Sequence, residues 1–166
     1  NGFEFLFASY ITNAMDATWL PQATGSGEEW KLLDNRRFPG FGYQIAGNDA
    51  GWAYLHDGRW KGTPEVDRGD VLLPEWRFAR PILVALQSST GLAVVTLVDP
   101  SVCSVLPTQH HRTETAHDFT LYGDLKAGTP FVGKARVVIR KIGTFPEAAK
   151  AVDAMWAEFL QSCKRP

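Results

Sequence analysis

Two apolar runs separated by a short polar turn constrain the fold of this chain more than any other feature. The first run covers residues 82–86 and the second covers 92–98, and Ser88-Ser89-Thr90-Gly91 supplies turn chemistry between them. Both runs are apolar at consecutive positions, so each strand is expected to be buried on both faces. Pro100 ends the second run because proline cannot donate a ladder hydrogen bond. The sequence therefore predicts a central antiparallel hairpin.

Alternating patterns predict further strands before this hairpin. Phe3, Phe5 and Phe7 recur with a period of two, which is typical of a strand with one apolar face. Short strands are also expected at 43–45 and 52–55, within a stretch that mixes glycine with aromatic residues.

A second hairpin is predicted after the central one. The segment HDFTLYG at 117–123 leads into a glycine-containing turn at 124–128, and PFVGKARVVIRKI follows. In the later strand, apolar and cationic residues alternate, which predicts one buried face and one wet face. The apolar set is Phe131, Ala135, Val137 and Ile139, and the cationic set is Lys134, Arg136 and Arg140.

The end of the chain has the pattern of an amphipathic helix over 145–162. Thr144-Phe145-Pro146-Glu147 matches a capping box, in which the threonine accepts a backbone hydrogen bond and the glutamate reaches back. Apolar residues follow at helical spacing and predict a stripe that covers the rest of the protein. The stripe comprises Phe145, Ala148, Ala149, Val152, Met155, Trp156, Phe159 and Leu160. We expect an antiparallel β-sandwich of about 8–10 strands with one C-terminal helix.

Composition bounds the class of protein. The chain has 166 residues, of which 45% are hydrophobic, and this is enough apolar material for one domain with its own core. A net charge of −1 argues against nucleic-acid or membrane binding through bulk charge. Two cysteines allow one disulfide at most and do not fix the redox compartment. No apolar run is long enough for a transmembrane helix, and no signal-peptide pattern is present.

The apolar pattern at the start of the chain raises the question of completeness. The chain has no initiator methionine and enters a strand-like pattern at once, with Phe3, Phe5 and Phe7 on one face. An apolar strand left at a sheet edge invites pairing with another strand. We therefore expect residues 1–166 to form either a single β-sandwich domain or the C-terminal part of a larger one. The chain is alternatively expected to pair with another chain.

Three of the four histidines lie in the segment PTQHHRTETAHDF, which is predicted to be a loop that leads into a strand at Phe119. His111, Glu114 and His117 have the residue types of a metal site, but no HExxH or CxxC pattern accompanies them. Histidine also suits general acid/base chemistry, because its pKa lies near neutrality. We expect His111 and His117 to act on a ligand, with His110 in a binding role, and we expect no metal and no cofactor. A plain solvated loop remains the alternative.

A second candidate group is GWAYLHDGRW, which places aromatic rings beside hydrogen-bonding groups. Sugars present apolar C–H faces and rings of hydroxyls, and this combination of side chains matches both. The candidate binding residues are Trp52, Tyr54, His56, Asp57 and Arg59. The alternative is that the aromatic residues belong to the core and that His56-Asp57-Gly58 is only a turn.

A third group precedes the first strand of the central hairpin. Glu75 is a candidate catalytic carboxylate, and Trp76 and Arg77 are candidate binding residues beside it. Charges at this position indicate either a ligand cleft or an ion pair at the rim of the sheet.

The order of these segments resembles the later part of galactose-mutarotase-like supersandwich proteins. The resemblance rests on LPEWRFARPILVALQSSTGLAVVTLVDP, on HDFTLYGDLKAGTPFVGKARVVIRKI, and on FEFLFASYITNAMDATWLP. It implies a β-sandwich whose concave face binds carbohydrate, and enzymes on that scaffold include mutarotases, which pair a histidine acid with a glutamate base, and polysaccharide lyases. A complete supersandwich has nearly twice this length, and no residue here matches the mutarotase histidines. The expected function is carbohydrate recognition, with mutarotase- or lyase-like chemistry on a His/Glu pair. The alternative is a non-catalytic carbohydrate-binding module or a structural or interaction module.

Overall fold

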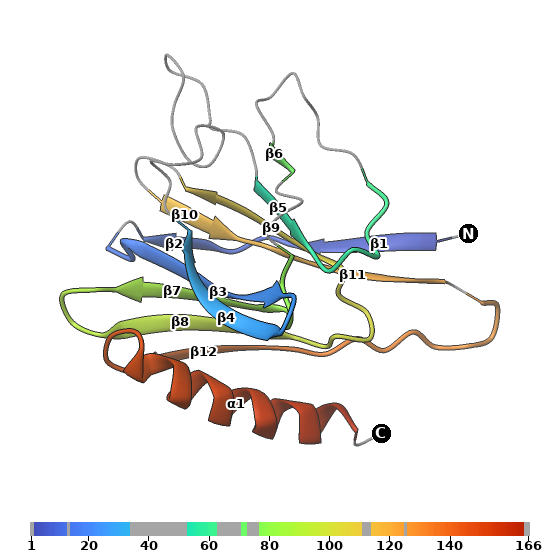
Figure 1. Cartoon of the computed structure of the whole chain (residues 1–166). Helices are drawn as coiled ribbons and strands as arrows, with labels where there is room; N and C mark the ends of the chain where they lie inside the picture. The colour runs from blue at the N-terminus through green and yellow to red at the C-terminus, as the bar shows by residue number, and fades with distance from the viewer. Residues whose placement is uncertain are drawn as a thin grey trace, which may run out of the picture.

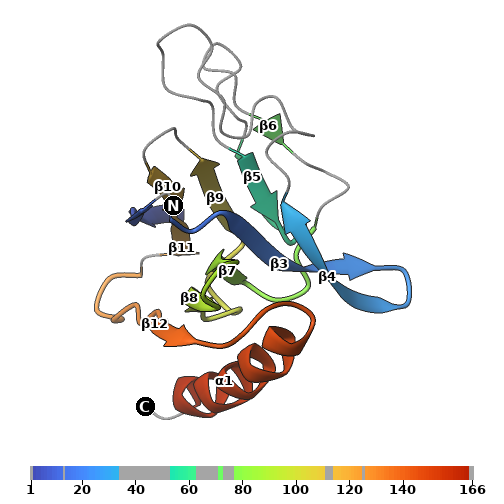
Figure 2. The same cartoon turned by 90° about the vertical axis from the view of Figure 1, so that its left-hand side faces the viewer.

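The computed structural model describes residues 2–12, 14–33, 53–62, 71–72, 77–110, 114–124 and 126–164. These residues form twelve strands and one C-terminal helix, so the predicted mainly β fold class is confirmed. Two layers of strands stack on each other, and the helix lies against the outer face of one layer (Figures 1 and 2). The predicted strand at 43–45 lies outside the described residues.

The layer next to the helix is a five-stranded antiparallel sheet, which we call the helix-side sheet. Its strand order is β12-β8-β7-β3-β4, with β7 and β8 forming the predicted hairpin at its centre. The strands are β3 (Ala17–Thr24), β4 (Gly27–Leu33), β7 (Ile82–Gln87), β8 (Leu92–Val98) and β12 (Ala135–Lys141).

The other layer, which we call the outer layer, is built from two sheets. One has the order β2-β10-β9-β5-β6, and the other is the antiparallel pair β1-β11, joined to it where the amide of Asp118 donates to the carbonyl of Pro107 at 2.9 Å. Within this layer β5 and β6 pair in parallel. The strands are β1 (Gly2–Phe7), β2 (Tyr10–Thr12), β5 (Ala53–His56), β6 (Val71–Leu72), β9 (Val105–His110), β10 (Glu114–His117) and β11 (Phe119–Asp124).

The central hairpin is buried on both faces, as predicted. Leu83 of β7 and Val98 of β8 point between the layers, whereas Ile82 and Val84 of β7 point at the helix. Continuous apolar runs are therefore required here, because this sheet has a protein layer on each side. The cluster between the layers comprises Leu20, Leu33, Ala53, Leu55, Phe78, Leu83, Val98, Cys103, Leu106, Phe119 and Leu121.

The helix α1 (Glu147–Cys163) covers the helix-side sheet with the predicted stripe. Ala148, Val152, Met155, Trp156 and Phe159 are buried. The predicted capping box is wrong, because the helix begins at Glu147 with Pro146 as its N-cap and without a side-chain cap hydrogen bond.

The side chains of Thr144 and Glu147, the first and last residues of the capping-box pattern, contact each other. The hydroxyl of Thr144 contacts the carboxylate of Glu147 at 3.4 Å instead of a backbone N–H. Phe145 stacks on Trp19 with ring centroids 4.3 Å apart, and this packing fixes the chain before the helix.

The predicted second hairpin is also wrong. β11 pairs with β1, and β12 pairs with β8 in the other layer, so the two strands joined by the turn at 124–128 lie in different layers. The faces of β12 are opposite to the prediction as well. Val137 and Ile139 are 53% and 71% exposed, whereas Val138 packs with the helix-side cluster. Arg136 also lies on the helix side, with its guanidinium 5.7 Å from the Phe159 ring centre and 3.1 Å from the Glu158 carboxylate.

The segment PTQHHRTETAHDF is mostly strand rather than loop, although Phe119 opens a strand as predicted. Pro107 and Thr108 lie within β9, which pairs with β10 on one side and β5 on the other. The carbonyl of Pro107 accepts from Asp118, at the break between β10 and β11. A proline is tolerated at this point because the ladder is interrupted beside it.

Candidate functional site

The candidate site lies on the outward face of β5 and in the loop that follows it. Ala53 and Leu55 are fully buried between the layers, so the alternate residues Tyr54 and His56 face away from the core. The loop after His56 brings Trp60 back over the same face.

Tyr54 and Trp60 form the aromatic part of this site. Their rings are nearly parallel, with centroids 5.2 Å apart and an interplanar angle of 7°, and both residues are half-buried. Gly62 leaves room for the indole, because a Cβ at that position would come within 2.2 Å of the Trp60 ring. Glycine at position 62 therefore permits this placement of Trp60.

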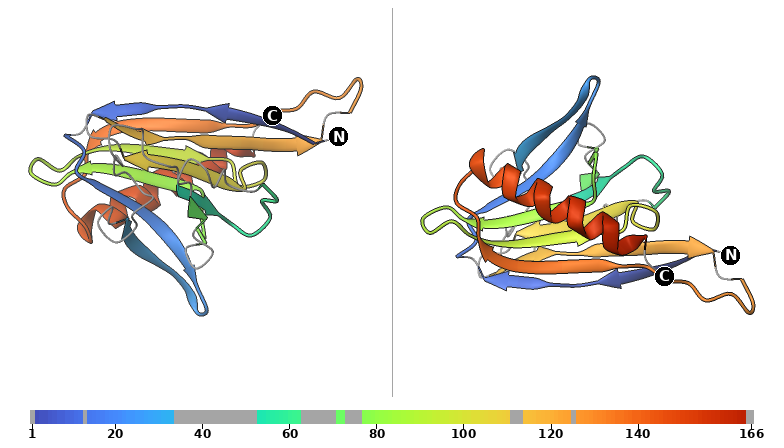
Figure 3. Two further views of the ribbon diagram at one scale, coloured as in Figure 1. Left: turned by 90° about the horizontal axis from the view of Figure 1, so that it is seen from above. Right: turned by 90° about the horizontal axis from the view of Figure 1, so that it is seen from below.

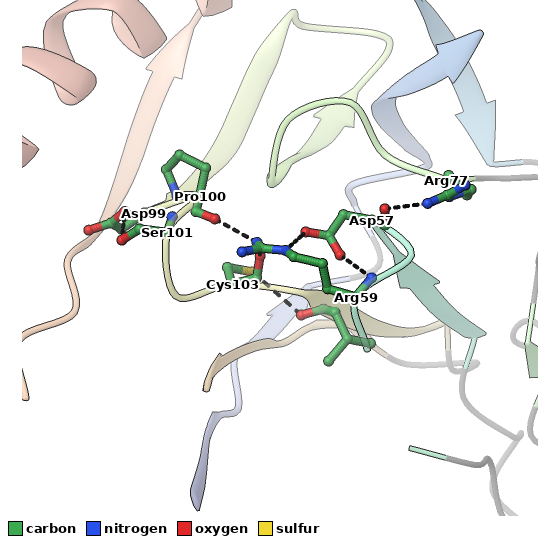
Figure 4. A network of polar contacts seen from close by, with 8 residues as sticks. Asp57, Arg59, Arg77, Asp99, Pro100, Ser101 and Cys103 are labelled. Carbon is green, nitrogen blue, oxygen red and sulfur yellow. Dashed lines mark hydrogen bonds and ion pairs between the residues drawn. The ribbon is translucent and has the colours of Figure 1, made fainter. Parts of the chain in front are cut away.

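Asp57 and Arg59 form a clamp that holds the loop after β5 against the turn at 99–103 (Figure 4). The Arg59 Nε donates to the Asp57 carboxylate at 2.6 Å, and the Arg59 amide donates to the same carboxylate at 2.8 Å. The guanidinium also donates to the carbonyls of Pro100 at 2.6 Å and Cys103 at 2.9 Å. Both charged groups therefore have partners within the protein, although the Arg59 side chain is exposed.

Arg77 braces the same loop from the other side. Its Nη2 donates to the carbonyl of Asp57 at 2.8 Å, and its guanidinium crosses Gly58, where a Cβ would lie 1.6 Å from Nη2. Gly58 also has a φ of 97°, which favours glycine. Arg77 therefore supports the loop geometry through a backbone carbonyl.

His56 supplies a neutral nitrogen next to the aromatic pair. Burial and the nearby Arg77 guanidinium lower the pKa of His56, and the Asp57 carboxylate only partly opposes this. Its Nε2 is buried and has no hydrogen-bond partner among the described residues. Buried polar atoms are normally hydrogen-bonded, so this nitrogen lacks the partner that such an atom usually has.

His117 lies between the layers rather than at a rim. It is fully buried, and its Nε2 lies 3.0 Å from the Thr18 hydroxyl of β3 in the opposite sheet. The Ser9 hydroxyl donates to the backbone carbonyl of His117, not to its ring. Ser9, His117 and Asp118 therefore do not have the geometry of a hydrolase triad.

Asp118 is a buried carboxylate beside His117. It is 1% exposed, and its Oδ1 accepts from the amide of Ser9 at 2.9 Å. Its Oδ2 is buried without a hydrogen-bond partner in the described part of the chain. Burial raises the pKa of Asp118 to about 6, although the Ser9 amide opposes the shift.

The structure brings together Tyr54, His56, Asp57, Arg59 and Arg77, and it places His117 in the separate buried cluster. Trp52, Glu75, Trp76 and His111 lie outside the described residues. His110 ends β9, and its side chain is likewise not described. Trp60 belongs to the predicted aromatic group GWAYLHDGRW but was not among its candidate binding residues, although its position just after the turn glycine Gly58 could have indicated that it folds back over Tyr54.

Two further chemical features concern the described residues only. No three His, Cys, Asp or Glu side chains there lie close enough to hold a metal ion. Cys103 and Cys163 are both free thiols, and burial raises the pKa of Cys103 to about 12, which keeps it protonated. The same part of the chain holds no helix with the length and apolar character needed to cross a membrane.

Comparison with protein families, with curated proteins and with solved structures finds no match to this chain.

Proposed function

We propose that this chain is a non-catalytic carbohydrate-recognition module that binds sugar at Tyr54 and Trp60. The observation that carries the proposal is the parallel pair of rings on the outward face of β5. With centroids 5.2 Å apart, the rings are offset, so each leaves part of its face uncovered. A flat apolar surface of this kind suits the C–H face of a pyranose ring.

His56 supports the proposal from the polar side. Its lowered pKa keeps the ring neutral at pH 7, and it lies on the same face of β5 as Tyr54. A ligand hydroxyl can both donate and accept, and it therefore suits a neutral imidazole in either tautomer. Specific binding sites commonly combine apolar surface with a few placed polar groups of this type.

The charged groups around the Tyr54–Trp60 pair, which we call the platform, favour binding over catalysis. Asp57 is held by Arg59, and Arg77 is held by the carbonyl of Asp57. His117 is buried between the layers. The mutarotase- or lyase-like alternative depends on a His/Glu pair, and Glu75 and His111 lie outside the described residues, so that alternative stays a prediction.

A glycan array followed by titration of the best ligand tests the proposal. Trp60→Ala is expected to weaken binding about tenfold or more, because it removes one ring of the platform. Gly62→Ala should weaken binding as well, since its methyl group displaces the indole without removing it. Tyr122→Ala is the matched control, because Tyr122 is an exposed aromatic residue on β11.

Two outcomes would contradict the proposal. If wild type, Trp60→Ala and Gly62→Ala bind glycan equally, the Tyr54–Trp60 pair is not the binding surface. Acceleration of sugar mutarotation or of uronide cleavage, lost in Glu75→Gln and His111→Ala, would favour the enzymatic alternative.

A further inference from the structure

The two layers of the sandwich end on the same side of the molecule in strands with one open edge each. β1 closes the outer layer and β12 closes the helix-side sheet, and both lie along one side in the views of Figures 2 and 3. Among the described strands, β1 pairs only with β11, and β12 pairs only with β8. Each strand therefore presents one row of backbone groups without a strand partner.

Phe5 and Phe7 of β1 face the interior but are left uncovered. Phe5 and Phe7 lie opposite Leu121 and Phe119, which belong to the core between the layers. Residues directly opposite each other in an antiparallel pair share a face. Even so, Phe5 and Phe7 are 59% and 46% exposed. The inner face of the outer layer is therefore open at this edge.

β12 shows the same feature in the other layer. Val137 and Ile139 lie opposite Thr96 and Val94 of β8. Thr96 and Val94 alternate with the residues of β8 that face the helix, so Val137 and Ile139 point toward the space between the layers. Since both are exposed, the sandwich has an apolar opening bounded by β1 and β12. We call this opening the open edge.

We propose that a second copy of this chain closes the open edge, with β1 of each copy pairing with β12 of the other. In this dimer the two-fold axis runs parallel to the strands, beside the open edge. The outer layer of one copy then continues into the helix-side sheet of the other. The two contacts are then identical, and the assembly is closed rather than filamentous. Both rows of free backbone groups gain partners, and the four apolar side chains of each copy become interior.

The sequences of the two strands match for this pairing. β1 contains Glu4-Phe5-Leu6-Phe7, and β12 contains Arg136-Val137-Val138-Ile139-Arg140. When Phe5 and Phe7 lie beside the inward residues Val137 and Ile139, Leu6 falls beside Val138. Glu4 then falls beside Arg136 or Arg140, according to the direction of the strands. Opposite charges at neighbouring cross-strand positions stabilise a pair.

Charge also argues against the simplest other pairing. Two β12 edges would bring the arginines of both copies together, and like charges opposite each other destabilise a sheet. Arg140 is exposed and forms no ion pair with any residue that the structure describes, so it is available to Glu4. The exposed Leu6 is also accounted for, because it gains Val138 as a neighbour.

Sedimentation velocity of the 166-residue chain, from micromolar to submillimolar concentration, tests the proposal. The wild type is expected to form a dimer, and Ile139→Asp to raise the dimer dissociation constant about tenfold or more by placing a charge in the closed edge. Leu32→Asp is the matched control, since Leu32 is an exposed apolar residue on β4, the edge strand at the other end of the same sheet. Ile139→Thr, which keeps strand propensity, provides a second variant should Ile139→Asp fail to fold.

A charge exchange identifies the pairing itself. Glu4→Arg should weaken the dimer, and either Arg140→Glu or Arg136→Glu should restore it, depending on strand direction. A wild-type chain that stays monomeric throughout the concentration range would overturn the proposal. A dimer that is equally stable in wild type and Ile139→Asp would overturn it too, because the contact would then lie elsewhere.

Discussion

The centre and the edge of the helix-side sheet show how apolar residues in one sheet can have opposite exposure. At the centre, β7 and β8 have the second layer on one side and α1 on the other, and their side chains are buried on both faces. At the end of the sheet, β12 has equally apolar residues at Val137 and Ile139, and these are exposed. Apolar sequence is therefore not sufficient for burial, since an opposing layer must also be present.

Truncating one residue in the core between α1 and the helix-side sheet and one at the edge of that sheet should give the largest difference in stability. Phe159 is 2% exposed between α1 and the helix-side sheet, and Phe159→Ala should lower the free energy of unfolding by about 3–5 kcal/mol. In the monomer, Ile139→Ala should change it by no more than about 0.5 kcal/mol. Urea denaturation at low protein concentration measures both, and equal losses would show that the open edge is buried in the monomer.

On the outer layer, the buried Asp118 carboxylate joins the segment after β1 to the start of β11. Its pKa of about 6, against an ordinary 3.8, means that the folded state holds this proton more tightly than the unfolded chain. The contribution of Asp118 to stability should therefore rise by about 2–3 kcal/mol as the pH falls from about 7 to about 4.

Asp118→Asn isolates this effect from the other carboxylates. The difference in unfolding free energy between wild type and variant, measured by urea titration at several pH values, should favour the wild type progressively toward pH 4. A difference that does not vary with pH would show that the carboxylate is solvated.

The contact between the β7–β8 turn and the loop after β12 gives a somewhat smaller expected effect. Gly91 ends the β7–β8 turn with a φ of 70°, and a Cβ there would lie 2.9 Å from the Cα of Gly143. Gly91→Ala should cost about 2 kcal/mol from backbone strain and this backbone contact together. Gly25→Ala in the β3–β4 turn is the control, because nothing lies within 4 Å of its added Cβ. Gly91→Ala should lower the midpoint of thermal unfolding more than Gly25→Ala does. Equal midpoints would show that the contact between Gly91 and Gly143 does not contribute to stability.

A smaller loss of stability is expected at the clamp of the candidate site. Arg59→Lys keeps the charge but loses the fork that reaches the Asp57 carboxylate and two carbonyls at once. Because the side chain is largely exposed, we expect a loss of about 1 kcal/mol. Sugar affinity should fall together with stability if the clamp positions Trp60. If Arg59→Lys binds sugar with the affinity of the wild type, the clamp does not position Trp60.

Local patterns predicted the parts of the fold that depend on near neighbours. The hairpin of β7 and β8 and the stripe of α1 follow from periodicity and turn chemistry, and both are confirmed. The pairing of β11 and β12 was wrong because a short turn suggested a hairpin, whereas the two strands enter different layers. The exposed face of β12 was wrong for a related reason, since sequence does not reveal which face meets a second layer.

The candidate site was predicted less well than the fold. Residue type drew attention to Asp57, Arg59 and Arg77, but their partners are backbone carbonyls and one another, which only the tertiary structure reveals. His117 has the chemistry of a catalytic residue and the location of an interior one. The Tyr54–Trp60 stack depends on the course of the loop between them, which Gly58 and Gly62 permit but do not specify.

We expect the buried hairpin of β7 and β8 to hold the fold together and a second copy to close the open edge. Hydrogen–deuterium exchange at low and high protein concentration tests both halves in one experiment. Amides of β7 and β8 should be protected equally at both concentrations, whereas amides of β1 and β12 should gain protection as concentration rises. Protection of β1 and β12 that is the same at both concentrations would contradict the account.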